Sequence, residues 1–297
     1  MSGIYLVLGA GGNLGRRVTV RLISDGHKVR GLVRSHHKAA MVERFGAEAG
    51  LFDLEDPDSL TPHLKGVTHI INTSYIFFAK NILKVVRNHS ELRDGQVRLV
   101  FVGSTGVHTR LKSESAERKR IGERVILESG LPFTILRPTM IYGHARDGNI
   151  SRLIRSFQKI PVFPVFGNGL AMMQPIYIGD VVGAVVNVME RSETRGKIYD
   201  IGGPEPMTYR DLLEKVSAAS DKKIRFIHVP LWFTVGLVKV LLAFKVSPLS
   251  VEQVLRLTEN KQVDNSRARK DFGFDPISFQ EGLGLQLLDM ERKDVPA

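Results

Sequence analysis

The sequence contains no cysteine, and this absence excludes several kinds of protein. A chain without cysteine has no disulfide framework, no thiolate metal site and no cysteine nucleophile. Near the C-terminus the longest apolar stretch without a charge, residues 226–238, is too short to span a bilayer. No basic segment precedes the first apolar run at residues 4–8, so we expect no signal peptide and a cytoplasmic protein.

Acidic residues are fewer than basic ones, with 31 Asp and Glu against 42 Lys and Arg and a formal net charge of +11. A basic surface can attract nucleic acid, anionic lipid or a phosphorylated ligand. The basic residues are scattered, and the densest cluster, residues 118–120, lies among glutamates as on a solvated helix. We therefore do not expect nucleic acid as a partner. Of the 297 residues, 43% are hydrophobic, enough for one large domain or a domain with a smaller lobe.

Short β-branched runs alternate with amphipathic segments through the first half of the chain. Strands are expected at residues 4–8, 28–33, 49–52, 68–72, 97–102 and 133–136. Helices are expected between them at residues 16–24, 38–45, 79–88 and 114–129, the last followed by Gly130 as its C′ residue. Alternation of this kind predicts βαβ units and, because crossovers are right-handed, a doubly wound parallel sheet.

The pattern becomes looser after Pro138 and predicts a second, smaller part. A helix near residues 179–190 and a strand near 197–201 restore the regular pattern, and the rest is helical with one strand at 224–229. The predicted fold class is α/β, a doubly wound parallel Rossmann sheet with a smaller, mostly helical C-terminal lobe. The expected Rossmann domain comprises residues 1–138 and 173–203, and the expected lobe comprises residues 139–172 and 204–297.

A glycine-rich turn follows the first expected strand and opens the first expected helix. Its glycines have the spacing G-x-x-G-x-x-G, a variant of the dinucleotide fingerprint. Glycine permits the positive φ of a tight turn and a close approach to a pyrophosphate, and the helix N-terminus presents free N–H groups to that anion. The predicted cofactor-binding residues here are Gly9, Gly11, Gly12, Asn13, Leu14 and Gly15. The alternative is a tight βα turn that binds no ligand.

An acidic residue is missing at the end of the second expected strand. Sites that prefer NAD usually carry Asp or Glu there to bind the ribose 2′-hydroxyl, but no acid lies between Asp25 and Glu43. Arg34, with Lys38 as a second cation, can bind a 2′-phosphate instead. We therefore predict NADP(H) as the cofactor in preference to NAD(H); the alternative is that both are solvated loop charges. After the third strand, Asp53 either accepts from the adenine amino group or caps a turn.

Several segments together resemble those of atypical short-chain dehydrogenases/reductases. The resemblance is to the branch that contains NmrA-like proteins and the Rossmann-type accessory subunit of respiratory complex I, which is similar to NAD-dependent epimerase/dehydratase proteins. It covers nearly the whole chain, at residues 9–15, 32–34, 53–54, 101–105, 129–138, 141–143, 174–182, 202–205, 263–268 and 272–274. It implies further cofactor contacts by Leu54, Asn72, Thr73, Lys119, Pro138 and Met140.

The usual proton donor of that superfamily is missing here. Reduction in the superfamily uses a Tyr-x-x-x-Lys pair with a Ser or Thr, and the tyrosine phenol is the general acid. The resemblance implies catalytic roles for Lys119 and for Ser104 or Thr105, but the residue four before Lys119 is Ser115. None of the 6 tyrosines has Lys four positions later. Because a serine hydroxyl is far less acidic than a phenol, Ser115 is a poor replacement.

Two other side chains could act at this end of the site. His108 stands four before Lys112 and could donate a proton, since imidazole titrates near neutrality, although a loop histidine is more often only solvated. Tyr75, after the fourth strand, either lines the nicotinamide end or packs as an ordinary aromatic. No metal site is expected, because the 9 histidines include no H-E-x-x-H pair.

An apolar segment in the C-terminal part, residues 229–246, has two interpretations. It contains Trp232 and Phe233, and its charges are Lys239 and Lys245. A core helix or the wall of a pocket is the first interpretation. The second is a surface helix that makes a peripheral contact with a membrane or a membrane complex.

Three functions remain open from the sequence. The first is an NADPH-dependent reductase of a small carbonyl, enone or quinone-like substrate. The second is a non-catalytic NADP(H)-binding scaffold or redox sensor with a protein partner, which the missing tyrosine favours. The third is a nucleotide-sugar epimerase or dehydratase, which is the least favoured because that chemistry depends on the missing tyrosine.

Overall fold

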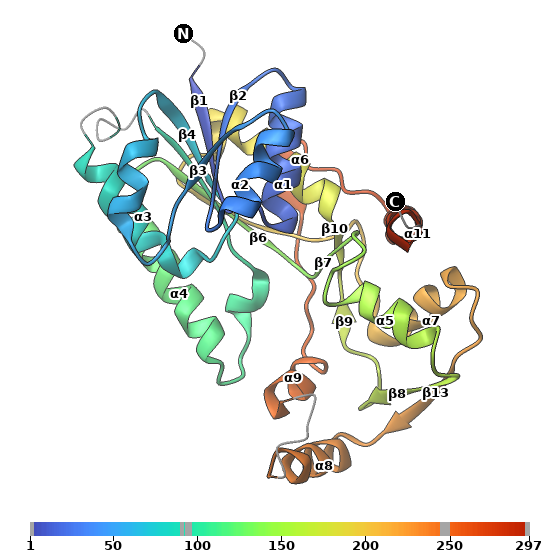
Figure 1. The fold of residues 1–297 in the computed structure, drawn as a ribbon. Helices are drawn as coiled ribbons and strands as arrows, with labels where there is room; N and C mark the ends of the chain where they lie inside the picture. Colours follow the sequence, from blue (N-terminus) through green and yellow to red (C-terminus); the bar gives the residue numbers. More distant parts are fainter. Residues whose placement is uncertain (1–2, 90–91, 93–96, 244–249, 295–297) are drawn as a thin grey trace.

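Seven parallel strands form the central sheet of the computed structural model, which describes residues 3–89, 92, 97–243 and 250–294 (Figure 1). The order across the sheet is β11-β6-β5-β4-β1-β2-β3. The strands are β1 (Ile4–Leu8), β2 (Lys28–Val33), β3 (Glu48–Leu51), β4 (Val67–Asn72), β5 (Arg98–Val102), β6 (Phe133–Pro138) and β11 (Lys197–Ile201). The predicted doubly wound parallel sheet is therefore confirmed, with a late segment of the chain, β11, paired to β6.

Two hydrophobic cores lie on the two faces of this sheet. Successive residues of a strand point to opposite faces, so Val7 of β1 belongs to one core while Leu6 and Leu8 belong to the other. The first core is covered by α1 (Asn13–Ser24), α2 (His36–Arg44), α6 (Ile178–Glu190) and α10 (Ser266–Phe272), and the second by α3 (Ala79–Asn88) and α4 (Glu114–Leu127). Burial on both faces explains why the strands are continuous apolar runs in the sequence.

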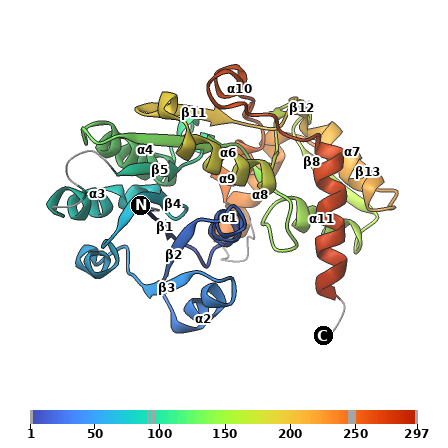
Figure 2. The ribbon, with the colours of Figure 1, turned by 90° about the horizontal axis from the view of Figure 1, so that it is seen from above.

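A smaller, mostly helical lobe carries a third core. Its helices are α5 (Ile150–Phe157), α7 (Tyr209–Ala219), α8 (Leu231–Ala243), α9 (Val251–Arg256) and α11 (Phe279–Asp294). The short strands β7 (Ile141–Tyr142), β8 (Val162–Phe166), β9 (Met172–Met173), β10 (Ile176–Tyr177), β12 (Met207–Thr208) and β13 (Arg225–Val229) pair as β10-β7, β12-β9 and β13-β8. Figure 1 shows α8 and α9 below the sheet, and Figure 2 shows α11 and α3 on opposite sides of the molecule. The exact residues that divide the two parts stay a prediction.

Three expected helices have different ends, among them α2, which covers His36–Arg44 rather than residues 38–45. The first, α1, begins at Asn13 rather than at residue 16, because the glycine turn itself supplies the N-cap at Gly12. The fourth, α4, ends at Leu127 rather than at residue 129, because the Ser129 hydroxyl accepts from the Leu131 N–H and closes a turn. Gly130 has φ +68°, but it is not the C′ residue that was expected: with the C-cap at Glu128, the C′ position is Ser129 and Gly130 follows it. The connecting 3-10 segments are Pro57–His63, Ile76–Phe78, Thr105–His108 and Ser192–Thr194.

Most of the apolar segment at residues 229–246 forms the surface helix α8 (Leu231–Ala243), whereas Val229 ends β13 and residues 244–246 lie outside the described ones. Trp232 is 77% exposed, Phe233 50% and Leu237 47%, whereas Val238 is buried. The interpretation as a core helix is therefore wrong for these three exposed side chains, and docking on a membrane or a membrane complex stays a prediction. Among the helices of the described residues, none has the length and apolarity needed to cross a bilayer.

Two glycines of α11 test how this helix packs on the lobe. A Cβ on Gly282 would lie 2.2 Å from Tyr142 Oη, whereas a Cβ on Gly284 would meet nothing within 4 Å. We expect Gly282→Ala to lower the free energy of unfolding by about 1–3 kcal/mol, because the buried phenol must move. Gly284→Ala is the control and should raise it by about 0.5–1 kcal/mol, since alanine favours the helix. Urea unfolding measures both, and equal effects would contradict this packing.

Candidate cofactor and substrate site

The carboxyl ends of the parallel strands line two cavities. The first, of about 350 Å³, lies where β1, β2, β3 and β4 end, and the second, of about 390 Å³, lies where β5 and β6 end. The neighbours β1 and β4 begin the two halves of the sheet, so the strand order reverses between them. Ligands of open α/β sheets bind at such a switch point, outside the carboxyl ends of the strands.

The glycine turn brings backbone groups close together beside the first cavity. Gly9 has φ +83°, and a Cβ on Gly15 would lie 2.1 Å from the Gly9 carbonyl oxygen. Gly12 is the N-cap of α1 and supplies no side-chain cap, and the first turn contains no acidic residue. The free N–H groups and the positive end of the helix dipole therefore suit an anionic group such as a pyrophosphate.

Two cations line the first cavity, and one of them lies against the glycine turn. Arg34 follows β2 and Lys38 lies in α2, and both line the cavity. A Cβ on Gly11 would be 2.8 Å from Lys38 Cδ, so the lysine stem passes over the glycine turn. No carboxylate takes the place of Arg34 at the end of β2. Such cations can bind a phosphate, and the preference for NADP(H) over NAD(H) stays a prediction.

Asp53 caps a turn and also lines the first cavity. Its Oδ1 accepts from the Glu55 N–H at 3.0 Å, and the Ser59 hydroxyl accepts from the Asp53 N–H at 3.1 Å. The turn-capping interpretation is therefore confirmed by these bonds. Asp53 and Leu54 lie on the cavity wall, so a contact with adenine stays a prediction.

Aromatic side chains and a further arginine line the first cavity beyond those expected. Tyr75 is 61% exposed, lines this cavity and stacks its ring on Phe77 with centroids 5.0 Å apart, so it packs against another aromatic at the cavity wall, and a contact with the nicotinamide stays a prediction. The Arg118 guanidinium carbon lies 4.0 Å from the centre of the Phe77 ring. Arg118 belongs to α4 and reaches this cavity through the tertiary fold. In the sequence it lies on what looks like a solvated helix face.

Ser104, Lys119 and an arginine of the lobe meet beside the second cavity. A Cβ on Gly106 would lie 3.2 Å from Arg256 Nη2, 3.3 Å from Ser104 Oγ and 3.5 Å from Lys119 Nζ. Burial and the nearby Arg256 charge lower the pKa of Lys119. The Ser104 oxygen accepts from the Gly106 N–H at 3.1 Å, which leaves its own proton for another acceptor. Ser115 is exposed and lines neither cavity, so it does not replace the phenol.

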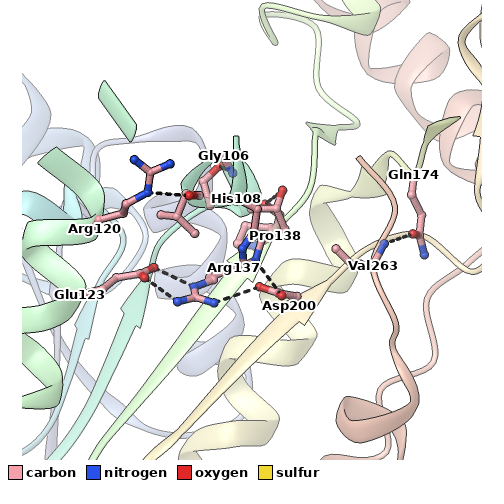
Figure 3. Close-up of polar contacts among 12 residues, drawn as sticks. Gly106, His108, Arg120, Glu123, Arg137, Pro138, Gln174, Asp200 and Val263 are labelled. Atoms are coloured by element: carbon pink, nitrogen blue, oxygen red, sulfur yellow. Dashed lines mark hydrogen bonds and ion pairs between the residues drawn. The ribbon is translucent and has the colours of Figure 1, made fainter. Parts of the chain in front are cut away.

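His108 is fixed at the edge of the second cavity by a chain of charged groups (Figure 3). Its Nε2 lies 2.9 Å from Asp200 Oδ2, and Arg137 Nη1 is 3.6 Å from the other oxygen of Asp200. Arg137 also makes a two-pronged contact with the buried Glu123, at 2.9 and 2.6 Å. Burial alone would lower the pKa of Arg137, but the bonds to Glu123 outweigh it and raise that pKa. His108 is therefore an oriented side chain rather than a freely solvated one.

The structure brings most of the predicted site residues to these two cavities. The first is lined by Gly9, Gly11, Gly12, Arg34, Lys38, Asp53, Leu54 and Thr73, and the second by Ser104 and Met140. Asn13, Leu14 and Gly15 form the first turn of α1, Lys119 adjoins Gly106, and Pro138 ends β6. Asn72, at the end of β4, is fully buried, and its Nδ2 has no hydrogen-bond partner within the described part of the chain. The roles of all these residues in cofactor binding and catalysis stay predictions.

The fold and the first cavity define a dinucleotide-binding protein of the Rossmann type. Residues 9–156 match the family model described as NAD(P)H-binding, so this part of the chain is an NAD(P)-binding domain. The chain matches UDP-glucose 4-epimerase from Thermotoga maritima with a TM-score of 0.77 and 16% identity, over 98% of this chain and 100% of that one. At that identity, the likeness shows the fold alone.

Curated relatives at low identity cover most of the chain. Photosystem II assembly factor Ycf39 of Trieres chinensis is 24% identical over 90% of this chain and 84% of its own length. NADH dehydrogenase [ubiquinone] 1 alpha subcomplex subunit 9 of Arabidopsis thaliana is 26% identical over 77% of this chain and 61% of its own. The 2-alkyl-3-oxoalkanoate reductase of Shewanella oneidensis is 24% identical over 93% and 84%. The resemblance read from the sequence is thereby confirmed.

The Glu123–Arg137 contact provides a stability prediction. Glu123→Ala leaves the Arg137 charge without its closest partner in a buried setting, so we expect the free energy of unfolding to fall by about 3 kcal/mol. Glu117→Ala is the control, because it removes an exposed partner of Arg120 at 3.1 Å, and should cost at most about 0.5 kcal/mol. Denaturant unfolding at neutral pH measures both, and a cost for Glu123→Ala no larger than that of the control would refute the role of this pair.

Proposed function

We propose that the chain is an NADP(H)-dependent reductase of a small carbonyl, enone or quinone-like substrate. The observation that carries the proposal is the presence of two cavities at the carboxyl ends of the parallel strands. One is lined by a glycine turn, Arg34 and Lys38, and the other has Ser104 and Lys119 side by side. The similarity to a protein named as a reductase of 2-alkyl-3-oxoalkanoates supports the same class of reaction.

The first cavity binds the dinucleotide. The N-terminal turn of α1 holds the pyrophosphate, because its N–H groups have no side-chain cap. Arg34 and Lys38 hold the ribose 2′-phosphate by charge-assisted hydrogen bonds. Asn72 ends β4, which lies between β1 and β5 in the sheet, and its buried Nδ2 is a donor without a described partner. This donor suits an oxygen of the bound dinucleotide.

The second cavity binds and polarises the substrate. A reduced nicotinamide, when bound, would supply the hydride for the substrate carbon, and the residues of this cavity would hold the substrate and deliver one proton to its oxygen. The Ser104 hydroxyl donates a hydrogen bond to that oxygen, since its own oxygen already accepts from Gly106. Lys119 favours the developing negative charge through its ammonium group. His108 is the proton donor that takes the place of the phenol, and the contact of its Nε2 with Asp200 holds the ring at the edge of the cavity.

A non-catalytic NADP(H)-binding scaffold or sensor is the second candidate function. The apolar side chains of α8, with Trp232 77% exposed, favour a protein partner or a membrane surface. Two relatives are named as a subunit or an assembly factor of a larger complex, which supports a partner for this chain too. The missing phenol fits this function as well. Turnover separates it from the reductase.

The assignment of the 2′-phosphate to Arg34 predicts a selective loss of affinity. Arg34→Glu should raise the dissociation constant of NADPH by about 10- to 100-fold, because the charge-assisted contact with the 2′-phosphate is lost. Each tenfold change corresponds to about 1.4 kcal/mol of binding free energy. NADH, which has no 2′-phosphate, should change by less than about threefold. Arg44→Glu, an exposed charge reversal in the same helix region, is the control. Fluorescence titration measures all three proteins, and equal weakening of both dinucleotides would disprove the assignment.

The reductase proposal predicts that Ser104 acts in turnover and not in cofactor binding. NADPH oxidation is followed at 340 nm with a panel of small ketones, enones and quinones. Ser104→Ala should lower kcat by about 10²-fold, since it removes one donor to the substrate oxygen. The same change should leave the NADPH dissociation constant unaltered. Tight NADPH binding with no oxidation across the panel would contradict the reductase and support the scaffold.

A further inference from the structure

Cations gather around the second cavity from three separate parts of the chain. Lys119 comes from α4, Arg256 from the last turn of α9, and Lys261 from the segment that follows α9. Arg256 Nη2 and Lys119 Nζ lie beside Gly106, together with the Ser104 hydroxyl. The lobe therefore places two positive side chains, Arg256 and Lys261, at the same cavity as Ser104, one of the groups that are proposed to act on the substrate.

Burial and the Arg256 charge lower the pKa values of Lys119 and Lys261, and the charges of the nearby acidic residues, Glu252 and Glu259 respectively, raise them without outweighing this effect. Glu259 is held by other donors: both of its oxygens accept from the Thr109 hydroxyl, at 2.8 and 2.7 Å, and one accepts from the Arg110 N–H at 3.1 Å. Glu252 Oε1 is 3.8 Å from Arg256 Nη1, which makes a loose ion pair. The other terminal nitrogen of Arg256, Nη2, lies beside Gly106 at the cavity. Within the described residues, neither Lys119 Nζ nor Lys261 Nζ makes a hydrogen bond or an ion pair.

Lys261 is held rigidly in this position. The Lys261 N–H donates to the Met172 carbonyl at 2.7 Å, and the side chain of the preceding Asn260 accepts from the Met172 N–H at 2.9 Å. Two residues further on, the Val263 N–H donates to Gln174 Oε1 at 2.7 Å (Figure 3). Burial and the Arg256 charge lower the pKa of Lys261 to about 8. A bound anion would stabilise this partly buried ammonium beside Arg256, in addition to the Glu259 carboxylate that is already near it.

We propose that the second cavity recognises a substrate that carries an anionic group, a carboxylate or a phosphate, in addition to the group that is reduced. Arg256 and Lys261 hold the anion, while Ser104 contacts the reducible oxygen. The inference rests on the proposed reductase function and names its substrate class. Arginine suits such a contact because its planar fork matches the oxygens of both anions.

The phosphates of the dinucleotide are not the anions that these side chains fit. The glycine turn, Arg34 and Lys38 line the first cavity, at the ends of β1 and β2. Arg256 and Lys261 line the second cavity, at the ends of β5 and β6, and both come from the lobe. The cations of the lobe therefore face the substrate end of the site.

The experiment measures binding without turnover. The protein is saturated with NADP⁺ and titrated calorimetrically with 4-oxopentanoate, with its neutral methyl ester, and with inorganic phosphate. The acid and the ester share one ketone and differ only in charge, so their ratio reports anion recognition. We expect the acid to bind at least about tenfold more tightly than the ester. Phosphate that binds more tightly than the acid would assign the anion subsite to a phosphorylated substrate.

Three variants test which side chains hold the anion. Arg256→Gln and Lys261→Gln should each weaken the binding of 4-oxopentanoate by about tenfold and leave the ester unchanged. Arg110→Gln is the control, because Arg110 is exposed beside this region and does not line the cavity. The charged and titratable groups that face the cavity are Lys119, His108, Arg256, Glu259 and Lys261. Affinity for the acid should fall as the pH rises through 8, and Lys261→Gln should remove most of that fall.

The outcomes separate this inference from the function on which it rests. Equal affinity for acid and ester, no binding of either anion, or unchanged acid binding by both glutamine variants would each overturn it, provided that NADP⁺ still binds. A protein that binds neither NADP⁺ nor NADPH would instead contradict the proposed function. NADP⁺ affinity is therefore measured first for each variant, and we expect it to be the same in all four proteins.

Discussion

The contact between the Gly9 carbonyl and the first turn of α1 is the constraint on which the site depends. Any side chain at Gly15 would come within 2.1 Å of that carbonyl oxygen, so the helix can start this close to β1 only because glycine is there. The Thr73 hydroxyl donates to the Leu8 carbonyl at 2.8 Å and holds the end of β4 against the same turn. The helix N-terminus is thereby aimed at the point where the sheet order reverses, and a phosphate can approach its N–H groups.

The site has two ends, which carry different kinds of side chains. The ends of β1 to β4 carry the glycine turn and the cations Arg34 and Lys38, and the ends of β5 and β6 carry hydroxyls and a fixed histidine. The lobe closes the second end with side chains of its own. The missing phenol does not leave this end without polar groups, because Ser104, Lys119 and His108 converge there from three positions in the first half of the chain.

Much of the fold could be read from the sequence, because both faces of the sheet are covered and the strands are continuous apolar runs. The glycine turn and Arg34 could be read as well, since local backbone geometry and a missing carboxylate are properties of short segments. Residues that meet only through the fold could not. Arg118 belongs to a helix that looks solvated, and Arg256 and Lys261 lie far from Ser104 in the chain. The sequence also did not determine whether α8 is exposed, since an apolar helix has the same residue pattern whether it is buried or on the surface.

Selective dinucleotide binding is the central claim, and one measurement tests it most directly. Purified protein is titrated with NADPH and with NADH in parallel, with cofactor fluorescence as the signal. The arrangement of the glycine turn with Arg34 and Lys38 predicts saturable binding of NADPH at least about tenfold tighter than that of NADH. NADH binding as tight as NADPH binding would contradict the role of the two cations, and binding of neither would contradict the cofactor site itself.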